Sequence, residues 1–356
     1  MAGKLKAGVL GATGSVGQRF ILLLQGNPLF DLVALGASSR SAGKAYAKVT
    51  SWKQGSHIPT SVADIVVTEC VPEAFKGCDV VFSGLDASVA GEIEEQFVNA
   101  GLNIISNAKN FRQHSHVPLC VPTANPEHLD ALEFRDKSRG IHVCISNCST
   151  AGLVVALKAL TEKFGPISHV VLTTLQAISG AGFSPGVGGM DILDNIVPYI
   201  GGEEDKLEIE PRKILGSFST SSKEFQLIPE QDMKISATTT RVPVIDGHTA
   251  SVSIKFANTK PSLAEVQQCL TDYSSQCETL HCPSAPEKPL VYLEQPDRPQ
   301  PRLDRDIGNG FTVSVGRLRE DSVLDYKFVC LSHNTVLGAA GSGILIAELL
   351  HAKKLI

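Results

Sequence analysis

The sequence has no excess of basic residues and no apolar run long enough to cross a membrane. Its 356 residues include 32 Lys and Arg against 37 Asp and Glu, for a net charge of −5. Proteins that bind nucleic acid or a membrane surface need a basic face, which this balance does not favour. The longest apolar run, residues 338–350, is too short to span a bilayer. We therefore expect no nucleic-acid partner, no membrane association and a cytoplasmic protein.

The sequence also lacks paired cysteine motifs. Its nine cysteines are scattered and odd in number, which does not fit a disulfide framework. Cys269, Cys277 and Cys282 lie near His281, but without the CxxC pairs of a zinc site. We expect reduced cysteines and no metal.

The length and the apolar pattern indicate two domains. An apolar fraction of 43% with 19% charged residues is typical of a globular protein, and 356 residues exceed one ordinary core. In the first 150 residues, short apolar runs alternate with amphipathic stretches, which predicts a Rossmann-type parallel sheet covered by helices. The expected strands are residues 7–10, 32–36, 80–82, 103–106 and 141–146, and the expected helices are residues 17–25, 89–100 and 152–163.

The remaining residues predict a second domain of the α+β class with a mainly antiparallel sheet. Its expected strands are residues 170–178, 225–227, 238–245, 249–256 and 311–318, with a helix at 263–271. Residues 283–302 are rich in Pro and charge and are expected to form a surface excursion. An apolar helix at 334–350 is expected to pack back on the first domain. The predicted division is therefore a discontinuous nucleotide domain, 1–147 with 334–356, and a catalytic and dimerisation domain, 148–333.

A glycine-rich turn follows the first expected strand and opens the first expected helix. Its GxxGxxG form provides a tight turn, close approach of the backbone to a pyrophosphate, and amides at a helix N-terminus. The alternative is an ordinary tight turn between strand and helix. The turn residues expected to contact a dinucleotide are Gly11, Thr13, Gly14, Ser15, Val16 and Gly17.

The second expected strand ends in a loop that contains Ser38, Ser39 and Arg40. Sites for NAD usually place an acidic residue here, to bind the ribose 2′-hydroxyl. Hydroxyls and an arginine suit a 2′-phosphate instead, so the loop favours NADP(H), although it could also be a solvated polar loop.

Cys148 lies where a strand leads into a helix, next to Asn147. A helix N-terminus stabilises a thiolate and lowers the pKa of a cysteine. Cys144, inside the strand, fits an inert buried cysteine better. The position predicts that Cys148 is a nucleophile.

Arg241 and His248 flank an Asp246-Gly247 turn. If that turn is a two-residue hairpin, Ile245 pairs with His248, and Arg241 shares their face. A cation and an imidazole on one face suit a small anionic substrate, although two such residues beside a turn are more often surface residues.

Taken together, these motifs resemble aspartate-semialdehyde dehydrogenase, most closely the archaeal and fungal branch of that family. The resemblance runs from about residue 5 to 350, with the motifs in the same order and spacing. They are 11–17, 146–150, Gln176, 179–182, 210–213 and the pair Arg241 and His248.

The resemblance implies a role for each site residue. Cys148 attacks the aldehyde and forms a thioester after hydride transfer, with His248 as general base and then acid. Gln176 positions the intermediate beside Asn147, Arg241 holds the substrate carboxylate, and Glu210 faces the ammonium group. Arg112 and Lys213 are expected to bind phosphate. Ser179, Gly180 and Asn334 are expected to touch the cofactor.

The implied reaction is reductive dephosphorylation of L-aspartyl 4-phosphate to the semialdehyde with NADPH, by a homodimer or homotetramer. This step feeds threonine, methionine and, in some organisms, lysine. Two related enzymes remain alternatives: a malonyl-CoA reductase, with CoA in place of phosphate, and an N-acetylglutamyl-phosphate reductase. A non-enzymatic NADP-binding redox sensor is a third, but such a sensor needs no carboxylate clamp.

Overall fold

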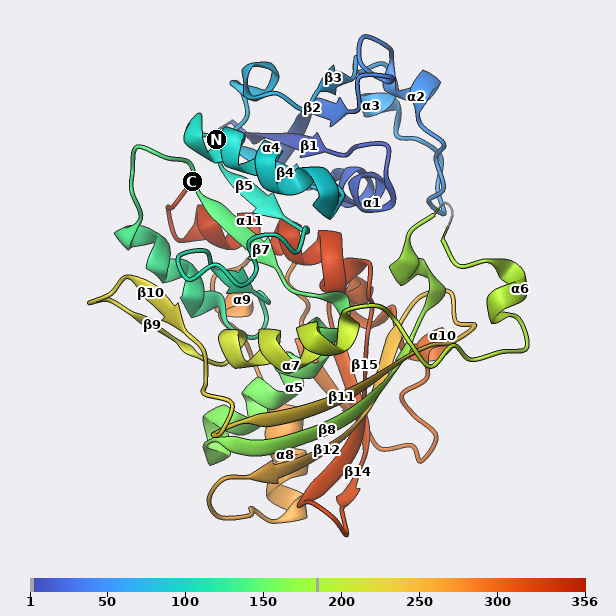
Figure 1. The fold of residues 1–356 in the computed structure, drawn as a ribbon, viewed down its shortest axis with the longest axis vertical. Helices are drawn as coiled ribbons and strands as arrows, with labels where there is room; N and C mark the ends of the chain where they lie inside the picture. The colour runs from blue at the N-terminus through green and yellow to red at the C-terminus, as the bar shows by residue number, and fades with distance from the viewer. Residues whose placement is uncertain (1–2, 184–185) are drawn as a thin grey trace.

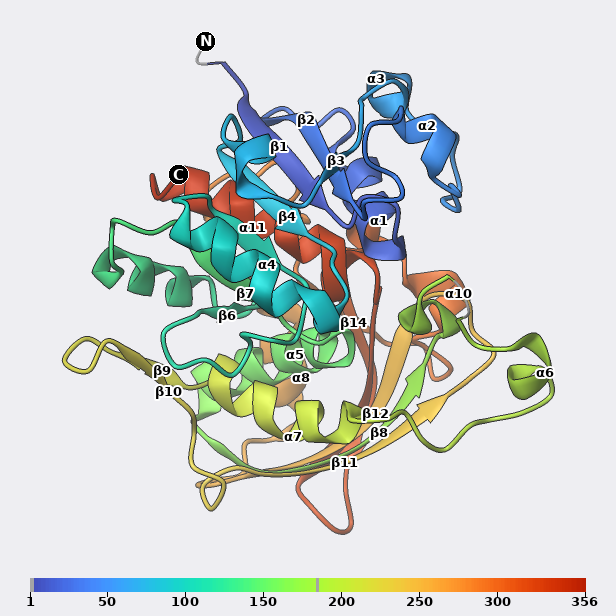
Figure 2. The same cartoon turned by 45° about the horizontal axis from the view of Figure 1, so that its top comes forward.

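The computed structural model of the protein describes residues 3–183 and 186–356. Its two main β-sheets occupy the upper and lower parts of the molecule as seen in Figure 1. A two-stranded hairpin, β9 (Ser217–Ser219) with β10 (Glu224–Gln226), and the loop that carries α6 (Gly189–Ile192) project on opposite sides (Figure 2).

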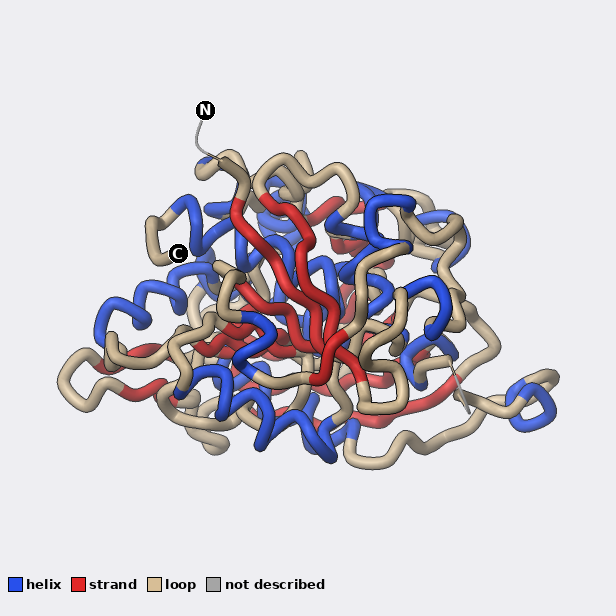
Figure 3. The backbone as a smooth tube through the Cα atoms, turned by 90° about the horizontal axis from the view of Figure 1, so that it is seen from above, coloured by secondary structure: helices blue, strands red, loops and turns tan. Residues whose placement is uncertain are grey.

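The first sheet has seven parallel strands in the order β3-β2-β1-β4-β5-β7-β6. Helices lie on either side of its strands when the molecule is seen from above (Figure 3). This arrangement confirms the Rossmann-type sheet predicted from alternating apolar runs and amphipathic stretches. The strands are β1 (Leu5–Leu10), β2 (Phe30–Ala37), β3 (Thr68–Glu69), β4 (Val80–Ser83), β5 (Ile104–Ser106), β6 (Leu119–Cys120) and β7 (His142–Ile145). The main helices of this part are α1 (Ser15–Leu24) and α4 (Ala87–Asn99).

The C-terminal segment packs against this first sheet. It consists of a π-helical turn, η5 (Val336–Ala340), in which Ala339 has non-helical backbone angles, and of α11 (Gly341–Ala352). Every residue of α11 from Gly341 to Leu350 is buried, in the same apolar cluster as residues of β1 and α1. This packing supports a discontinuous nucleotide domain. The segment is not the single helix that the sequence predicts.

The second sheet has six strands in the order β11-β8-β12-β15-β14-β13. Its three central pairs are antiparallel, whereas the pairs at the two edges, β11 with β8 and β13 with β14, are parallel. The strands are β8 (Ile167–Gln176), β11 (Lys234–Arg241), β12 (His248–Phe256), β13 (Leu290–Leu293), β14 (Val313–Glu320) and β15 (Tyr326–Ser332).

Three local predictions for this sheet are wrong. The strands β11 and β12 do not form a hairpin, because β8 lies between them and pairs with both. The strand expected at 225–227 pairs only with β9, outside the main sheet. The expected surface excursion at 283–302 contains β13, which forms an edge of the sheet.

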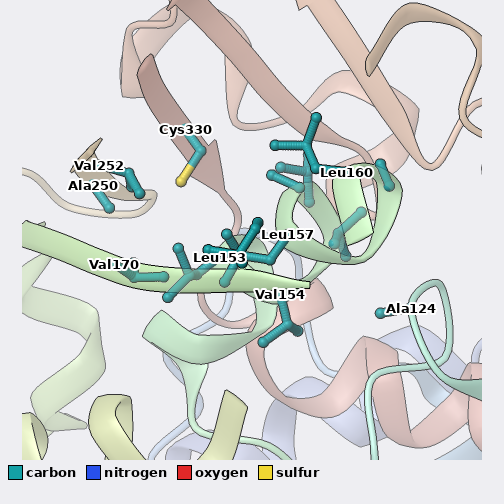
Figure 4. Packing of buried hydrophobic residues seen from close by; sticks show 14 of the residues in the cluster. Ala124, Leu153, Val154, Leu157, Leu160, Val170, Ala250, Val252 and Cys330 are labelled. Atoms are coloured by element: carbon teal, nitrogen blue, oxygen red, sulfur yellow. The ribbon is translucent and has the colours of Figure 1, made fainter. Parts of the chain in front are cut away.

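One face of the second sheet is covered by α5 (Cys148–Phe164) and α8 (Leu263–Asp272). Leu153 and Leu157 of α5 lie beside Val170 of β8, with Val252 and Cys330 on the neighbouring strands (Figure 4). Because α5 begins at Cys148, this packing fixes the position of the cysteine at the start of the helix.

A further helix, α7 (Glu203–Ile214), packs against α5 and β11. The remaining helices are short: α2 (Tyr46–Val49), α3 (Thr60–Ala63), η1 (Pro72–Phe75), η2 (Pro126–Phe134), η3 (Ile178–Ala181), α9 (Gln276–Thr279), α10 (Pro301–Asp304) and η4 (Ile307–Gly310).

Candidate active site

The glycine turn after β1 forms part of a cleft of about 910 Å³, the nucleotide cleft. Gly11 has a φ of +68°, and a Cβ there would lie 2.6 Å from the carbonyl oxygen of Gly84. A Cβ at Gly17 would lie 2.2 Å from the oxygen of Gly11, so Gly17 allows the helix to approach the turn. These close approaches are the geometry that a dinucleotide turn requires, and the turn fits a cofactor. The predicted cofactor residues that line the cleft are Gly11, Thr13, Gly14, Ser15, Val16, Ser38, Ser39 and Gly180.

Arg40 does not line the nucleotide cleft in this conformation. Its side chain is exposed, and its carbonyl oxygen accepts a hydrogen bond from Lys44 Nζ at 2.9 Å. Ser38 and Ser39, next to it, do line the cleft. A role for Arg40 at the 2′-phosphate therefore remains a prediction that needs a rotation of its side chain.

A second cleft of about 720 Å³, the catalytic cleft, adjoins the first and shares Ser15, Val16 and residues 180–183 with it. Its described lining includes six basic and three acidic side chains, which favours an anionic ligand. Many of the predicted site residues meet here although they are far apart in sequence. They are Arg112, Asn147, Cys148, Gln176, Ser179, Gly180, Arg241 and Asn334.

Cys148 is the first residue of α5, and Asn147 caps the helix. Asn147 Oδ1 accepts the backbone N–H of Ser149 at 2.9 Å and of Thr150 at 3.4 Å. Cys148 Sγ lies 3.3 Å from His248 Nε2, which confirms that the fold brings these two residues together.

The pKa of Cys148 is not lowered, contrary to what its position at a helix N-terminus predicts. Burial, with a smaller contribution from the nearby carboxylate of Glu203, raises it to about 12. Arg112, Arg241 and Lys206 act in the opposite direction but do not prevail. Desolvation therefore outweighs the helix terminus, and the thiol is protonated at neutral pH.

His248 is buried and held by the backbone of Ala177, where β8 ends. Its Nδ1 accepts the Ala177 N–H at 3.0 Å. Arg241 Nη1 donates to the carbonyl oxygen of the same residue at 2.7 Å. Burial, with smaller contributions from Arg241 and His333, lowers the pKa of His248 to about 3. His248 is therefore neutral.

Arg241 and Gln176 face each other across the β11–β8 pair, and both line the catalytic cleft. Gln176 Nε2 donates to Thr174 Oγ1 at 3.3 Å, which leaves its carbonyl oxygen free of any bond among the described residues. The proximity of Arg241 to His248 follows from this pairing and from β12 on the other side of β8. It does not come from the hairpin that the sequence predicts.

The structure does not bring Glu210 and Lys213 into the catalytic cleft. Glu210 is buried, with one carboxylate oxygen 3.0 Å from Arg112 Nη1 and the other accepting the Asn147 N–H at 2.6 Å. Lys213 Nζ donates to three backbone carbonyl oxygens, at 2.7, 2.8 and 2.8 Å. All three protons of Lys213 Nζ are engaged, and neither side chain lines the catalytic cleft, so this arrangement does not support the predicted contacts of Glu210 with ammonium and of Lys213 with phosphate.

Glu203 and Lys206 lie seven residues, about two turns, before Glu210 and Lys213 on α7. Both line the catalytic cleft, and they form an ion pair with each other. Glu203 Oε2 also accepts a hydrogen bond from Asn147 Nδ2 at 2.9 Å. The sequence contains two candidate pairs, because an E-x-x-K spacing occurs at both 203–206 and 210–213. The two pairs lie on the same face of α7, so only their positions along the helix distinguish them.

Asn334 joins two loops of the cleft. Its Oδ1 accepts the Gly247 N–H at 2.8 Å, and its Nδ2 donates to Ser179 Oγ at 2.9 Å. Both polar atoms are therefore engaged within the protein. Asn334 lies where cofactor contact was predicted, but it also fixes the turn that precedes His248.

Two further features bear on ligands and location. Within residues 3–183 and 186–356, no group of three or more His, Cys, Asp or Glu is placed to hold a metal ion. No helix in those same ranges is long and apolar enough to cross a membrane.

The chain matches two family patterns over most of its length. Residues 6–132 match the family described as semialdehyde dehydrogenase, NAD binding domain, and residues 157–337 match semialdehyde dehydrogenase, dimerisation domain.

Its relatives carry one name. The aspartate-semialdehyde dehydrogenase of Candida albicans is 62% identical, with 99% of each chain covered. Those of Saccharomyces cerevisiae and Archaeoglobus fulgidus are 58% and 43% identical, over 100% and 99% of this chain and all of theirs.

Solved structures agree with this. The crystal structure of the Candida albicans enzyme with NADP superposes with a TM-score of 0.94 at 60% identity, covering 99% of this chain and 100% of that one. A Vibrio cholerae aspartate semialdehyde dehydrogenase II shares the fold, with a TM-score of 0.75 at 24% identity, over 98% of this chain and 99% of that one.

Proposed function

The chain belongs to the aspartate-semialdehyde dehydrogenase family, and from that membership and the geometry of its cleft we propose how its residues carry out the reaction. The protein is an NADP-dependent enzyme that reduces L-aspartyl 4-phosphate to L-aspartate 4-semialdehyde with release of phosphate. The reaction belongs to the biosynthesis of threonine and methionine and, in some organisms, lysine.

Cys148 is the proposed nucleophile, and its contact with His248 at 3.3 Å is the observation that carries the proposal. The sulfur attacks the acyl phosphate carbon, phosphate leaves, and a thioester forms on Cys148. NADPH, held by the residues of the nucleotide cleft, would supply the hydride. Cys148 leaves as the aldehyde forms, so the cysteine divides one difficult reduction into an acyl transfer and a hydride transfer.

The substrate is held by charged groups that line the cleft. Arg241 has a fork of donors suited to the α-carboxylate, and only its Nη1 is used by Ala177. Glu203 is the carboxylate placed to meet the ammonium group, in place of Glu210. We assign the phosphate to Arg112 and Lys206, in place of Lys213, because both line the catalytic cleft.

The domain division, the oligomeric state and the location of the protein complete the proposal. We propose that residues 1–147 with 334–356 form the NADP-binding domain and that 148–333 form the catalytic and dimerisation domain. The shared burial of α11 and α1 supports this division. The match to a dimerisation domain supports a homodimer or homotetramer, and a biosynthetic role supports a cytoplasmic location.

The test is the absorbance of NADPH on adding aspartate semialdehyde, NADP⁺ and phosphate to the purified protein. We expect NADPH to form only when phosphate, or its analogue arsenate, is present. CoA should not replace phosphate, and N-acetylglutamate semialdehyde should not replace the substrate. Faster turnover with either would favour the malonyl-CoA reductase or the N-acetylglutamyl-phosphate reductase.

A further inference from the structure

A third cleft of about 550 Å³, the histidine cleft, is separate from the site already described. It is formed by the loop of residues 111–118, by η2 with the residues that follow it to 142, and by the β9–β10 hairpin, at the left in Figure 1. Its described lining has no residue in common with the catalytic cleft or the nucleotide cleft. Since sites for small molecules are roughly 300–1,000 Å³, the histidine cleft has room for a ligand of its own.

The lining of the histidine cleft is mainly basic. Its six basic side chains come from three segments of the chain, and they are His114, His116, Arg135, Arg139, His142 and Lys223. Its carboxylates are those of Glu95 and Asp136, and the Asp136 carboxylate already accepts two hydrogen bonds from Ser138. The arginines and the lysine alone outnumber the carboxylates, so the cleft favours an anionic ligand.

Two of the basic side chains have a nitrogen that no described residue satisfies. Arg135 Nη1 donates to the carbonyl oxygen of Leu132 at 2.8 Å, whereas its buried Nε has no hydrogen-bond partner among the described residues. His114 Nδ1 accepts the N–H of His116 at 3.3 Å, so a neutral His114 carries its proton on Nε2. No side chain or backbone group in the described ranges accepts a bond from that Nε2. Donors of this kind are what the oxygen atoms of an anion would bind.

The groups around His114 all oppose a positive charge on it. Burial, with smaller contributions from four neighbouring basic side chains, lowers the pKa of His114, and these side chains are His116, Lys213, His142 and Arg139. The electrostatic potential at this end of the cleft is therefore positive, and an anion bound there would relieve the repulsion.

The histidine cleft also has an aromatic wall. Phe134 and Phe218 lie with their ring centroids 5.7 Å apart, and Phe134 is 42% exposed. The ring of Phe111 lies 4.6 Å from that of His142. Exposed aromatic rings beside several cations suit a ligand that has an apolar body as well as a negative charge.

The loop of residues 111–118 connects the histidine cleft to the catalytic cleft. His114 lines the former and Arg112 lines the latter, two residues away. Lys213 Nζ holds this loop by donating to the carbonyl oxygens of Arg112, His114 and Val117. A ligand that moves His114 should therefore also move Arg112.

We propose that the histidine cleft binds a small organic anion, a monophosphate or carboxylate on an aromatic or aliphatic body, and that its occupant displaces Arg112 from the phosphate site. The second part rests on the proposed function, in which Arg112 binds phosphate. Arg112 already lines the catalytic cleft in this arrangement, so a displacement of the loop should weaken its contact with phosphate.

Isothermal titration of the full-length protein with phenyl phosphate tests the site without turnover. We expect Arg139→Ala and Lys223→Ala each to weaken binding about tenfold, the value of one hydrogen bond to a charged group. Both side chains are exposed, so these variants should fold. Lys206→Ala, which alters only the catalytic cleft, and Arg302→Ala, at an exposed arginine of α10, should bind as wild type does. Phenol, which lacks the charge, should bind at least about tenfold more weakly than phenyl phosphate.

The opposite pattern would overturn the proposal. If Lys206→Ala abolishes binding while Arg139→Ala and Lys223→Ala leave it unchanged, phenyl phosphate binds in the catalytic cleft. Equal binding of phenol would show that the cations of the histidine cleft do not select an anion.

The phosphate dependence of NADPH formation tests the effect on Arg112. We expect phenyl phosphate to raise the KM for phosphate at least about threefold in the wild-type enzyme and to have little effect on it in Arg139→Ala. Inhibition that persists in Arg139→Ala would be competition in the catalytic cleft, and would overturn the link between the two clefts. A wild-type protein that forms no NADPH at all would instead count against the proposed function, and the titration would still decide whether the histidine cleft binds the anion.

Discussion

Cys148 and Cys144 lie four residues apart, yet their surroundings differ in a way that decides which one can react. Cys144 is buried inside β7, whereas Cys148 lies at the start of α5 and lines the catalytic cleft. The sequence predicted this difference, because a strand interior and a strand-to-helix junction differ in exposure. It could not predict that burial would raise the pKa of Cys148, since that depends on the side chains that α7 and β11 place around the sulfur.

The reactivity of Cys148 should depend on pH in a way that reports its raised pKa. A thiolate reacts with iodoacetamide and a thiol does not, so with a pKa of about 12 the alkylation rate should rise about tenfold per pH unit between pH 7 and 9 without levelling off. Removing the charge in Glu203→Gln lowers this pKa and should speed alkylation at any fixed pH in that range. Glu204→Gln is the control, since Glu204 bonds to Thr239 instead. A plateau of the wild-type rate below pH 9 would contradict the raised pKa.

The two lysines of α7 make an opposed pair of predictions. Lys206→Ala should raise the KM for phosphate about ten- to a hundredfold, the value of one hydrogen bond to a charged group, and change stability by less than about 1 kcal/mol. Lys213→Ala should destabilise the protein by about 3 kcal/mol, because it leaves three buried carbonyl oxygens without a donor. Phosphate kinetics and urea unfolding of both variants measure the two effects. If Lys213→Ala raised the KM for phosphate and Lys206→Ala lowered stability instead, Lys213 would be the phosphate ligand.

At the scale of elements, the sequence predicted what depends on neighbours along the chain and failed where pairing is non-local. Five of the seven strands of the first sheet and the helices α1, α4 and α5 were predicted to within a few residues, because apolar periodicity is a local signal. The two-residue strands β3 and β6 were not predicted. The Asp246-Gly247 turn has hairpin chemistry, but β8 inserts between β11 and β12. No local pattern in residues 234–256 indicates that a strand from residue 167 onward lies between them.

The π-helical turn η5 packs against the start of α5. A substitution in η5 should therefore alter catalysis by moving Cys148. A Cβ at Gly338 would lie 2.9 Å from Cys148 Cβ and 3.0 Å from its Cα. Gly338→Ala should therefore displace Cys148 and lower kcat about 100-fold, with a loss of about 1–3 kcal/mol of stability. Gly77→Ala is the control, because no atom lies within 4 Å of its added Cβ. A Gly338→Ala enzyme with wild-type kcat would show that η5 can yield without moving the cysteine.

At the scale of the whole molecule, the two sheets supply different parts of the active site. The carboxyl ends of β1 and β2 supply the nucleotide cleft, and the ends of β8 and β11 supply the catalytic cleft next to it. Asn334 and Gly247 are far apart in the sequence, and the hydrogen bond between them fixes the two clefts relative to each other. The alternation of strands and helices predicted two sheets, but not the contacts of Asn334 across them, since these join residues about 90 or more positions apart.

The helices α5 and α8 cover the inner face of the second sheet, while its outer face exposes Val171 and Leu175 of β8, the strand next to the edge, at 50% and 38%. Because this region matches a dimerisation domain, we expect a second copy to cover that face in an isologous interface.

Val171→Glu should then place a carboxylate in the interface twice. An unpaired buried charge costs several kcal/mol and tenfold corresponds to about 1.4 kcal/mol, so the dimer Kd should rise by roughly a thousandfold or more. Sedimentation or light scattering at micromolar concentration should show monomers. Val33→Glu is the matched control, a valine of 44% exposure on β2 that should leave the dimer intact. If Val171→Glu remains dimeric, the copies associate through another surface.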